Sequence, residues 1–567
     1  MGVRRAVEMV LDAPEEHLNP ISTYGSLIHN PQVLEILKEK GISAINDPPQ
    51  QGSGTILIRA HGVPPETRDQ LAEVGFNVID ATCPRVIKVQ TIIKKHLKKG
   101  FASIIVGDSN HPEVIGLRGY GGDKSYVAIN VDELNALPRF ENAIIVAQTT
   151  LNTHLWQAVK KWAADNHPHY KIFETICGST ERRQAEVQRL AESVDAVMVV
   201  GGRNSGNTKR LVDIARQTGK PAFHIESDTD LIDMDLEALT SARQIGITAG
   251  ASTPNWVIKK VYRALEAVLF KRKQGWRRVL FEIQRALLLT NIYVAVGAGA
   301  LCYACNKLQG IHQTFPYILI SMLYVQSMHI LNHLTDTRAD RFNDPDRAKF
   351  YDRHKTLLAI SAVLSGGAGL IIAYNIGLFP FLALLIMSLL GLSYNLKMVP
   401  EWLTGIKYRK IRDLPGSKTL LIAIAWGMVT AVLPPLSKFG TINWVNVLVA
   451  LWAVGMVFVR TAFFDLLDMQ GDRLVGKETI PILLGEKRSM HVLKIILLVL
   501  TATLVFSSAF QLTSSLGFFL IICPLLISII IIMYERALMF PGIRLEFLLE
   551  TQFLVAGIIS FGWILIS

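Results

Sequence analysis

Apolar and polar positions follow different patterns in the two parts of the chain. Up to about residue 270, short apolar runs such as 103–106 and 196–200 alternate with polar loops and amphipathic helical segments. The loops are rich in Gly, Ser, Asn or His. This repeat predicts parallel β-strands connected by helices, an α/β fold with an open sheet whose ligands bind at the carboxyl ends of the strands.

From about residue 286 onward, long apolar stretches are separated by short polar loops. Nine stretches, centred near residues 296, 323, 366, 385, 426, 454, 501, 524 and 556, are long enough or nearly long enough to cross a bilayer. We therefore predict an all-α domain of nine transmembrane helices over residues 286–567, after a first domain at 1–270. A basic, Trp-bearing linker at 271–285 is expected to lie against anionic lipid headgroups.

Composition agrees with a membrane protein. Of the 567 residues, 50% are hydrophobic, and the mean hydropathy of +0.32 is high for a soluble protein. The net charge of +11 resides mostly in loops beside the predicted membrane helices, which indicates membrane topology and gives no reason to expect nucleic acid as a partner. Residues 1–20 lack the apolar core of a signal peptide. We expect a multi-pass protein of the cell (inner) membrane, in contact with the lipid bilayer, with a cytoplasmic N-terminal domain.

The loops of the first domain contain residues suited to metal and anion binding. Cys83 and Cys177 lie in polar loops after predicted strands, where a soft metal site fits better than core packing. Two thiolates are a weak ligand set, because an iron–sulfur cluster generally takes three or four. Ser205, Asn207 and Ser252 add donors to helix N-termini that suit a phosphate or diphosphate, although one such loop is more often only a helix cap.

A series of short motifs in the first domain resembles, in order, the 4-hydroxy-3-methylbut-2-enyl diphosphate reductases of the LytB or IspH type. Examples are Asp-Ala-Thr-Cys-Pro at 80–84 and His-Pro-Glu at 111–113, and the resemblance covers residues 1–265. It implies three αβα lobes around a four-iron four-sulfur (4Fe-4S) cluster, with a ferredoxin or flavodoxin as electron donor.

The same resemblance implies roles for individual residues. Cys83 and Cys177 would be two of the three cysteine ligands of the cluster. Proton delivery is assigned to Glu113, with His111 and Thr149. The substrate diphosphate would be bound by His29, His61, Ser205, Asn207 and Ser252.

One cluster ligand of the family has no counterpart in this sequence. The family's first cysteine lies in a Gly-Phe-Cys-x-Gly-Val motif, whereas this chain begins Met1-Gly2-Val3. The ligand would lie one residue before Met1, so we expect the true start to lie upstream or the sequence to be truncated. The alternative is a genuine two-cysteine protein. As given, the chain is expected to assemble the cluster poorly.

Two acidic stretches lie at the ends of the second and sixth predicted membrane helices. Asn332, Asp336 and Asp340 recur every four residues and would share one helical face. The second stretch contains Asp465, Asp468 and Asp472. Such carboxylates suit Mg²⁺ together with phosphate oxygens. The alternative interpretation is that both stretches are solvated loops without a ligand. Charge for a diphosphate would be added by the neighbouring Arg338, Arg341, Arg347 and Arg473.

Together with Tyr394-x-x-Lys397 and the run at 476–481, these stretches closely resemble the UbiA-type intramembrane prenyltransferases, which have nine helices. The resemblance implies Mg²⁺-dependent transfer of a prenyl group from a prenyl diphosphate to an acceptor in the membrane. The implied Mg²⁺–diphosphate ligands are Asn332, Asp336, Asp340, Asp468 and Asp472. The implied supporting residues are Arg338, Arg341, Tyr394, Lys397 and Asp465.

Two features of the second domain depart from or lie outside this resemblance. The family often has Asn-Asp where this chain has Asn332-His333, and we expect His333 to point away from the metal-binding face. Cys302 and Cys305 form a C-x-x-C pair inside the first predicted membrane helix. Without partners nearby in the sequence, they are expected to face lipid or core and not to bind a metal.

We predict a bifunctional isoprenoid enzyme. Its reductase would convert 4-hydroxy-3-methylbut-2-enyl diphosphate to isopentenyl and dimethylallyl diphosphate, and its transferase would use a prenyl diphosphate and Mg²⁺. Two alternatives stay open: a prenyltransferase with a degenerate diphosphate-binding module, or a reductase with a membrane anchor or lipid transporter. A chain-elongating synthase must intervene if the prenyl donor is long, so the sequence gives no support for direct channelling between the two halves.

Overall fold

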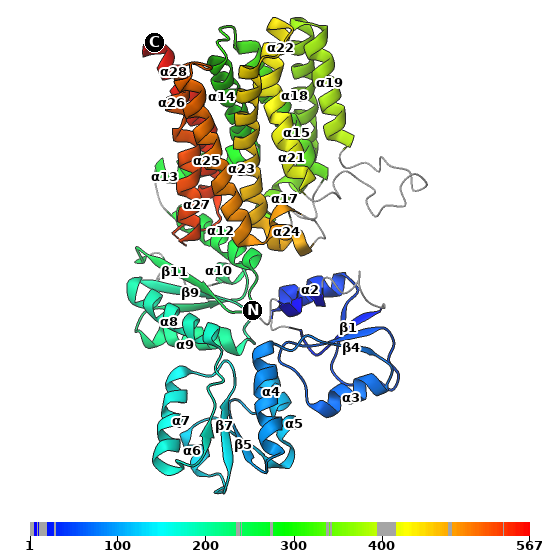
Figure 1. Cartoon of the computed structure of the whole chain (residues 1–567), viewed down its shortest axis with the longest axis vertical. Helices are drawn as coiled ribbons and strands as arrows, with labels where there is room; N and C mark the ends of the chain where they lie inside the picture. The colour runs from blue at the N-terminus through cyan, green and yellow to red at the C-terminus, as the bar shows by residue number, and fades with distance from the viewer. Residues whose placement is uncertain are drawn as a thin grey trace. The chain divides into compact units, whose positions relative to one another are not determined.

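The computed structural model describes residues 5–7, 9–10, 20–27, 30–233, 239, 241–272, 276–335, 340, 343–393, 416–474, 479–536 and 538–566. Contacts between residues divide the chain into two compact units, Met1–Val261 and Tyr262–Ser567. In these residues the first unit combines strands and helices, and the second consists of helices (Figure 1). The predicted succession of an α/β part and an all-α part is confirmed, whereas the boundaries at 270 and 286 stay a prediction.

The strands of the first unit form three separate sheets, and every strand pair in them is parallel. The first sheet has the order β2-β1-β3-β4. Three of its helices begin at Pro31, Pro65 and Pro84, because proline fixes a helical φ and its missing N–H has no partner at this position. The elements are β1 (Ile21–Tyr24), α2 (Pro31–Glu39), β2 (Ser43–Ile45), β3 (Thr55–Ile58), α3 (Pro65–Glu73), β4 (Asn77–Asp80) and α4 (Pro84–Leu97).

The second sheet has the order β6-β5-β7-β8, and its central strands β5 and β7 are buried at every position. Alternate side chains enter different cores, because Ile105 packs in a cluster with Val89 of α4 and Ile104 in a cluster with Trp156 of α7. The elements are β5 (Ala102–Val106), α5 (Pro112–Gly121), a 3₁₀ turn (Gly122–Lys124), β6 (Ser125–Ala128), α6 (Val131–Asn135), β7 (Ala143–Ala147), α7 (Thr153–Asn166) and β8 (Lys171–Ile172).

The third sheet has the order β10-β9-β11 around the fully buried strand β9. The helices α8 and α9 pack against this strand through Val187 and Leu211. After β11, helix α12 begins in the first unit and ends in the second. The elements are α8 (Gly178–Ser193), β9 (Ala196–Val200), α9 (Gly206–Gln217), β10 (Ala222–Ile225), α10 (Asp230–Asp233), β11 (Ile245–Ala249) and α12 (Asn255–Arg272).

The second unit is built from helices whose buried residues form one large apolar core. A π-helical turn at Met428–Val432 joins α21 to α22. The helices are α13 (Trp276–Leu289), α14 (Ile292–Leu308), α15 (Phe315–Thr335), α17 (Pro345–Arg353), α18 (Lys355–Ile376), α19 (Leu378–Ser393), α21 (Ser417–Gly427), α22 (Leu433–Phe439), α23 (Trp444–Leu474), α24 (Ile480–Leu484), α25 (Glu486–Ala509), α26 (Leu516–Leu520), α27 (Ile522–Glu535) and α28 (Ile543–Ile566).

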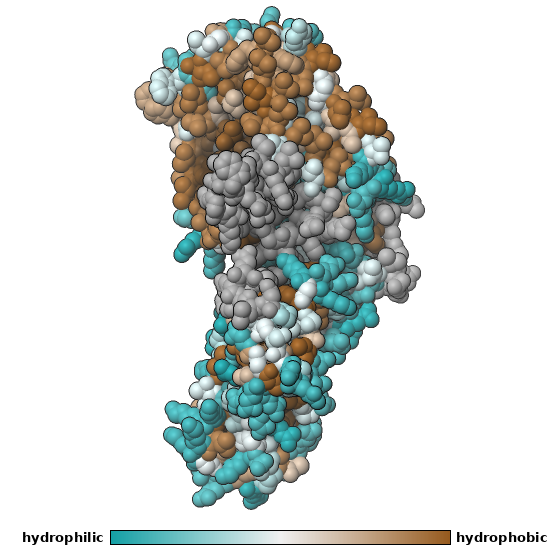
Figure 2. All heavy atoms as spheres, turned by 90° about the vertical axis from the view of Figure 1, so that its right-hand side faces the viewer, coloured by the Kyte–Doolittle hydropathy of each residue, from teal (hydrophilic) through white to brown (hydrophobic). Residues whose placement is uncertain are grey.

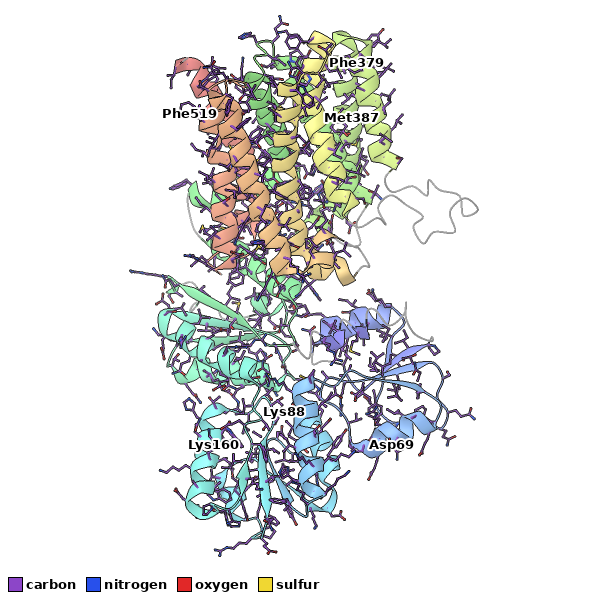
Figure 3. All side chains as sticks on the ribbon, in the orientation of Figure 1. Asp69, Lys88, Lys160, Phe379, Met387 and Phe519 are labelled. Atoms are coloured by element: carbon purple, nitrogen blue, oxygen red, sulfur yellow. The ribbon has the colours of Figure 1, made fainter. Side chains whose placement is uncertain are left out.

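The second unit also exposes large apolar side chains. On the face shown in Figure 2, hydrophobic residues cover much of this unit and hydrophilic residues predominate on the first. Figure 3 illustrates the contrast with Phe379 and Phe519 on the helices of the second unit and with Asp69 and Lys160 on the first. Exposed apolar surface of this extent indicates contact with lipid.

Helices occupy all nine predicted membrane positions, but only some of them are long and apolar enough to cross a bilayer. In the described part of the chain, six helices meet both conditions, and the pair α13 and α14, bent by 74°, makes a seventh if it is one span. Helix α19 is apolar but shorter. The structure therefore supports a multi-pass helical domain, and the count of nine spans stays a prediction.

Candidate functional sites

Predicted site residues of the first unit follow the carboxyl ends of its strands. Cys83 directly precedes α4, His111 precedes α5, Cys177 precedes α8 and Ser205 precedes α9. Each is the N-cap residue of its helix, so each lies beside backbone N–H groups that have no intrahelical partner. Ser252 lies in the same kind of loop, between β11 and α12. The expectation of ligand-binding loops at strand ends agrees with this placement.

Loops from all three sheets meet at His111. The imidazole rings of His61, which follows β3, and His111, which follows β5, have centroids 5.3 Å apart and are nearly perpendicular. A Cβ placed on Gly206, at the start of α9 after β9, would lie 3.9 Å from Nε2 of His111. The structure thus brings together polar residues that are far apart in the sequence.

Glu113 has a fully buried carboxyl group that accepts two hydrogen bonds. Its Oε1 accepts a hydrogen bond from the backbone N–H of Thr149 at 2.7 Å, and its Oε2 accepts one from the hydroxyl of Thr149 at 2.8 Å. Burial raises the pKa of Glu113 to about 7, and the two hydrogen bonds from Thr149 oppose that rise. Glu113 is therefore protonated in a substantial fraction of molecules near neutral pH and can donate a proton.

His111 is held in one orientation beside Glu113. Its Nδ1 accepts a hydrogen bond from the backbone N–H of Glu113 at 3.1 Å. In the neutral ring the proton then resides on Nε2, because Nδ1 acts as an acceptor. The Nε2 side is the one that approaches Gly206, so His111 presents a donor towards the loop of the third sheet.

The two predicted cluster cysteines remain thiols in suitable surroundings. Neither Cys83 nor Cys177 is in a disulfide, and both are partly exposed. A helix N-terminus favours the thiolate that binds iron. The backbone N–H of Cys177 donates to the carbonyl of Thr149 at 2.9 Å, which joins the second thiol to the Glu113 pair. These donors fit two positions of an iron–sulfur cluster.

Near the third sheet, polar atoms are buried without a hydrogen-bond partner among the described residues. They are Nδ2 of Asn207, Oγ1 of Thr208 and Oγ of Ser252. An unsatisfied buried group costs about 1–3 kcal/mol, which an anionic ligand such as a diphosphate would recover by accepting hydrogen bonds. Sequence reasoning missed Thr208, although its place three residues after Ser205 made it detectable; it lies in the first turn of α9.

The second acidic stretch lies on one face of α23. Asp465, Asp468 and Asp472 fall within an arc of about 60° at 100° per residue. Asp472 is buried and accepts a hydrogen bond from Nδ2 of Asn343 at 2.9 Å. Asp465 is buried and accepts one from the hydroxyl of Thr419. The three aspartates therefore form one acidic surface of α23.

The first acidic stretch differs from its prediction. Nδ1 of His333 lies 2.8 Å from Oδ2 of Asp340, whereas seven residues of continuous helix would separate the two positions by about 10 Å along the axis. The expectation that His333 points away from the metal-binding face is therefore wrong. Burial raises the pKa of Asp340, but His333, Lys418 and Arg347 nearby lower it to about 2. Asp340 is thus an ionised carboxylate at neutral pH.

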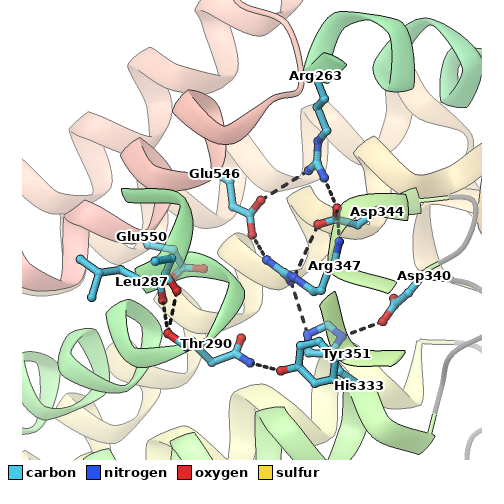
Figure 4. A network of polar contacts seen from close by, with 12 residues as sticks. Arg263, Leu287, Thr290, His333, Asp340, Asp344, Arg347, Tyr351, Glu546 and Glu550 are labelled. Carbon is cyan, nitrogen blue, oxygen red and sulfur yellow. Dashed lines mark hydrogen bonds and ion pairs between the residues drawn. The ribbon is translucent and has the colours of Figure 1, made fainter. Parts of the chain in front are cut away.

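Arg347, a predicted source of charge for a diphosphate, already has carboxylate partners. Figure 4 shows its guanidinium between Asp344 and Glu546, and Arg263 contacts the same two carboxylates. Its Nη1 also lies 3.4 Å from Nε2 of His333. We call Arg263, Asp344, Arg347 and Glu546 the buried ion ring.

The remaining predicted residues lie partly in the described helices and partly outside the described residues. Cys302 and Cys305 are buried in the helical core, in agreement with the prediction. Asn332 lies in the last turn of α15. In the residues that the structure describes, no three His, Cys, Asp or Glu side chains are grouped to hold a metal ion. Outside the described residues lie His29, Asp336, Arg338, Arg341, Tyr394 and Lys397, and the side chain of Arg473.

Comparison with known proteins assigns the first part of the chain. The family model described as LytB protein matches residues 1–266. The 4-hydroxy-3-methylbut-2-enyl diphosphate reductase of Opitutus terrae is 38% identical over 279 residues, which cover 96% of that protein and 47% of this chain. The chain belongs to the LytB family. The reductase of Thermoanaerobacter sp. is 40% identical over 269 residues, covering 92% of that protein and 47% of this chain.

The second part of the LytB-family chain matches a different family. The model of the UbiA prenyltransferase family covers residues 292–539. A UbiA homologue from Archaeoglobus fulgidus, solved with GPP and Mg²⁺, is similar with 15% identity and a TM-score of 0.37, covering 50% of this chain and 99% of that one. The reductase from Plasmodium falciparum is similar with 28% identity and a TM-score of 0.43, and the match covers 46% of this chain and 83% of that one. Residues 1–266 therefore match the LytB model and residues 292–539 match the UbiA model.

Proposed function

We propose that this protein is a bifunctional isoprenoid enzyme. Its LytB-type domain would reduce 4-hydroxy-3-methylbut-2-enyl diphosphate to isopentenyl and dimethylallyl diphosphate. Its UbiA-type domain would transfer a prenyl group from a prenyl diphosphate to an acceptor in the membrane. The observation that carries the proposal is the match of each half to its own enzyme family, together with the buried Glu113–Thr149 pair and the aspartate face of α23.

In the reductase, replacing the substrate hydroxyl by hydrogen consumes two electrons and two protons and releases water. A 4Fe-4S cluster, with Cys83 and Cys177 among its ligands, would supply the electrons and a Lewis acid when bound. Three lobes around such a cluster would agree with the three separate sheets. A ferredoxin or flavodoxin would deliver the electrons to the domain.

The chain's own residues would bind the substrate and move the proton. Glu113, with a pKa of about 7, would be the source of the proton. The Thr149 hydroxyl, which donates to Oε2 of Glu113 at 2.8 Å, would turn its O–H towards the substrate to relay that proton. His111 would add a donor from Nε2. The diphosphate would be bound by His29, His61, Ser205, Asn207 and Ser252, of which Asn207 and Ser252 have the unsatisfied atoms described above.

The reductase is tested by anaerobic reconstitution of the full chain, with and without Gly-Phe-Cys added before Met1. Iron, sulfide and product from the hydroxylated diphosphate are measured with a chemical reductant. We expect four irons per chain and turnover in the extended form. If neither form binds a cluster, the domain is a degenerate diphosphate-binding module.

In the transferase, acidic side chains would hold Mg²⁺ on the diphosphate of the donor. The donor set fits, because hard carboxylate oxygens together with phosphate oxygens are the ligands that Mg²⁺ prefers. Asn332, Asp336, Asp340, Asp468 and Asp472 would be ligands of the metal or the diphosphate. Support would come from Arg338, Arg341, Tyr394, Lys397 and Asp465. Mg²⁺ would neutralise the leaving diphosphate, and the apolar bundle would exclude water from the allylic cation.

We expect the UbiA-type domain to span the cell membrane nine times, with the reductase domain on the cytoplasmic side. Membranes containing the chain are incubated with dimethylallyl or geranyl diphosphate and candidate acceptors, with Mg²⁺ or a chelator. We expect diphosphate release and a prenylated lipid only with Mg²⁺. The absence of both with every donor and acceptor would favour a membrane anchor or a lipid transporter.

A further inference from the structure

Arg263 belongs to α12, a helix that lies outside the residues matched by the UbiA model. Arg263 itself lies within the residues that the LytB model matches, which end at residue 266. Yet its side chain, 9% exposed, makes its ion pairs with Asp344, next to α17, and Glu546, on α28. A charged side chain this deeply buried needs its partners, because removing either one leaves an uncompensated charge.

We propose that Arg263 is a positioning residue of the transferase. By its ion pair with Asp344, it holds in place the residues that connect the two acidic motifs. This inference rests on the proposed prenyl transfer. It deepens that proposal, because it gives the transferase a required residue from outside the UbiA match.

Two contacts connect Asp344, the partner of Arg263, to the first acidic motif. The backbone N–H of Asp344 donates to the carbonyl of Asp340 at 2.8 Å, so the two residues belong to one turn. Arg347, which shares both carboxylates of the ring with Arg263, lies 3.4 Å from His333, and His333 in turn contacts Asp340 at 2.8 Å (Figure 4). A displacement of Asp344 would therefore move Asp340.

A third contact connects the same residues to the second motif. Asn343, the residue before Asp344, donates from Nδ2 to Oδ1 of Asp472 at 2.9 Å, and both residues are buried. Asp340 of one motif is therefore connected through Asp344 and Asn343 to Asp472 of the other. Arg263 holds Asp344 in this connection.

Charge balance favours positioning over direct binding of diphosphate. The buried ion ring contains two guanidinium groups and two carboxylates, so it has no surplus positive charge for an anion. Burial lowers the pKa of Arg263, but Asp344 and Glu546 raise it overall, and Asp468 contributes in the same direction. The field of Arg263 therefore also reaches the second acidic motif.

The test compares Arg263→Gln with a matched control, Arg285→Gln, in the full-length protein. Arg285 of α13 forms an ion pair with Asp346 of α17 at 3.6 Å, and neither residue belongs to the buried ion ring. Binding of Mn²⁺ in the presence of inorganic pyrophosphate is followed by electron paramagnetic resonance, and Mg²⁺-dependent diphosphate release from geranyl diphosphate is measured in parallel. We expect Arg263→Gln to weaken Mn²⁺ binding about tenfold, as loss of residues that orient metal ligands does, and Arg285→Gln to change it less than twofold.

Arg263→Lys keeps the charge and covers the case in which Arg263→Gln does not fold. Lysine cannot contact both carboxylates with the fork geometry of a guanidinium, so we expect Mn²⁺ binding weakened about threefold, between wild type and Arg263→Gln. Wild-type Mn²⁺ affinity in a folded Arg263 variant would overturn the inference and leave the proposed function intact. If the wild-type protein neither binds Mn²⁺ with pyrophosphate nor releases diphosphate, the proposed prenyl transfer fails, and the inference fails with it.

Discussion

At the scale of single residues, the proposed reductase chemistry depends on Glu113. Full burial raises its pKa from the usual 4.5 to about 7, although the two hydrogen bonds from Thr149 act in the opposite direction. A carboxyl group that is protonated near neutral pH is suited to be a general acid. The sequence identified this residue through its His-Pro-Glu motif, but only the fold explains why its proton is available.

Glu113→Gln should abolish reductase turnover in the cluster-loaded protein, because the amide keeps the shape but has no acidic proton. In the unchanged protein, turnover should fall as pH rises through about 7, since Glu113 loses its proton there. The measurement is turnover against pH with a chemical reductant. A Glu113→Gln protein that retains the wild-type rate and pH profile would exclude Glu113 as the proton donor.

The same group should make the stability of the first unit pH-dependent. Because the pKa of about 7 in the folded protein lies above the usual value of 4.5, the contribution of Glu113 to stability is fully present below about pH 4.5 and is lost as pH rises through about 7. The difference is roughly 3 kcal/mol. Hydrogen exchange of the β5 and β7 amides between pH 5 and 8 should show this trend, and Glu113→Gln should flatten it.

In the UbiA-type domain, Asp336→Asn and Asp468→Asn should each nearly abolish Mg²⁺-dependent prenyl transfer. The amide removes a negative charge that Mg²⁺ needs, at almost the same size. Diphosphate release from geranyl diphosphate is measured at several Mg²⁺ concentrations. If both variants retain the wild-type rate, the acidic stretches are solvated loops and have no metal-binding role.

At the scale of elements, helix pairing in the membrane domain includes one buried ion pair. Arg460 of α23 contacts Glu550 of α28, and their side chains are 8% and 2% exposed. Apolar packing surrounds the pair, because Arg460 also lies over the rings of Trp426 and Phe464. Polar groups in such surroundings hold two helices in one register.

Glu550→Gln should destabilise the helical unit by about 3–5 kcal/mol, because it leaves Arg460 charged and without its carboxylate. The double variant Arg460→Met/Glu550→Gln, which removes both charges, should recover most of this loss. Thermal unfolding in detergent measures both. Equal stability of wild type and Glu550→Gln would show that the pair does not support the packing of α23 on α28.

At the scale of the whole molecule, the proposed function combines two enzyme types, each with its own predicted diphosphate site. The predicted catalytic residues of the reductase lie in the first unit, and the acidic motifs lie in the second. The two proposed reactions would use different metals. Each active site is therefore expected to work without the chemistry of the other.

Asp468→Asn should accordingly leave reductase turnover unchanged, and Glu113→Gln should leave prenyl transfer unchanged. Both activities are measured on the same preparations of the full chain, with the cluster reconstituted. A chelator selective for Mg²⁺ should stop only the transferase. A loss of both activities in either variant would indicate chemical coupling between the two domains.

Sequence patterns predicted local features well, because hydrophobic period and turn chemistry act over a few residues. The runs at 103–106 and 196–200 lie within β5 and β9. The same reasoning was wrong for His333, which was expected to point away from the face that holds Asp340 but contacts Asp340. Spacing also could not reveal that Arg347 is paired with Glu546, 199 residues away.

The sequence by itself determined the LytB family and the strand ends, and it predicted the resemblance to the UbiA family, the order of the domains and the acidic stretch that lies on α23. Only the tertiary structure decided which polar groups become partners, as with Arg263 and Glu546, 283 residues apart, or with His61 and His111 from different sheets. The physical reason is that local pattern sets which face of an element is apolar. Buried charges and donors must instead find partners wherever packing brings them, and that depends on the whole fold.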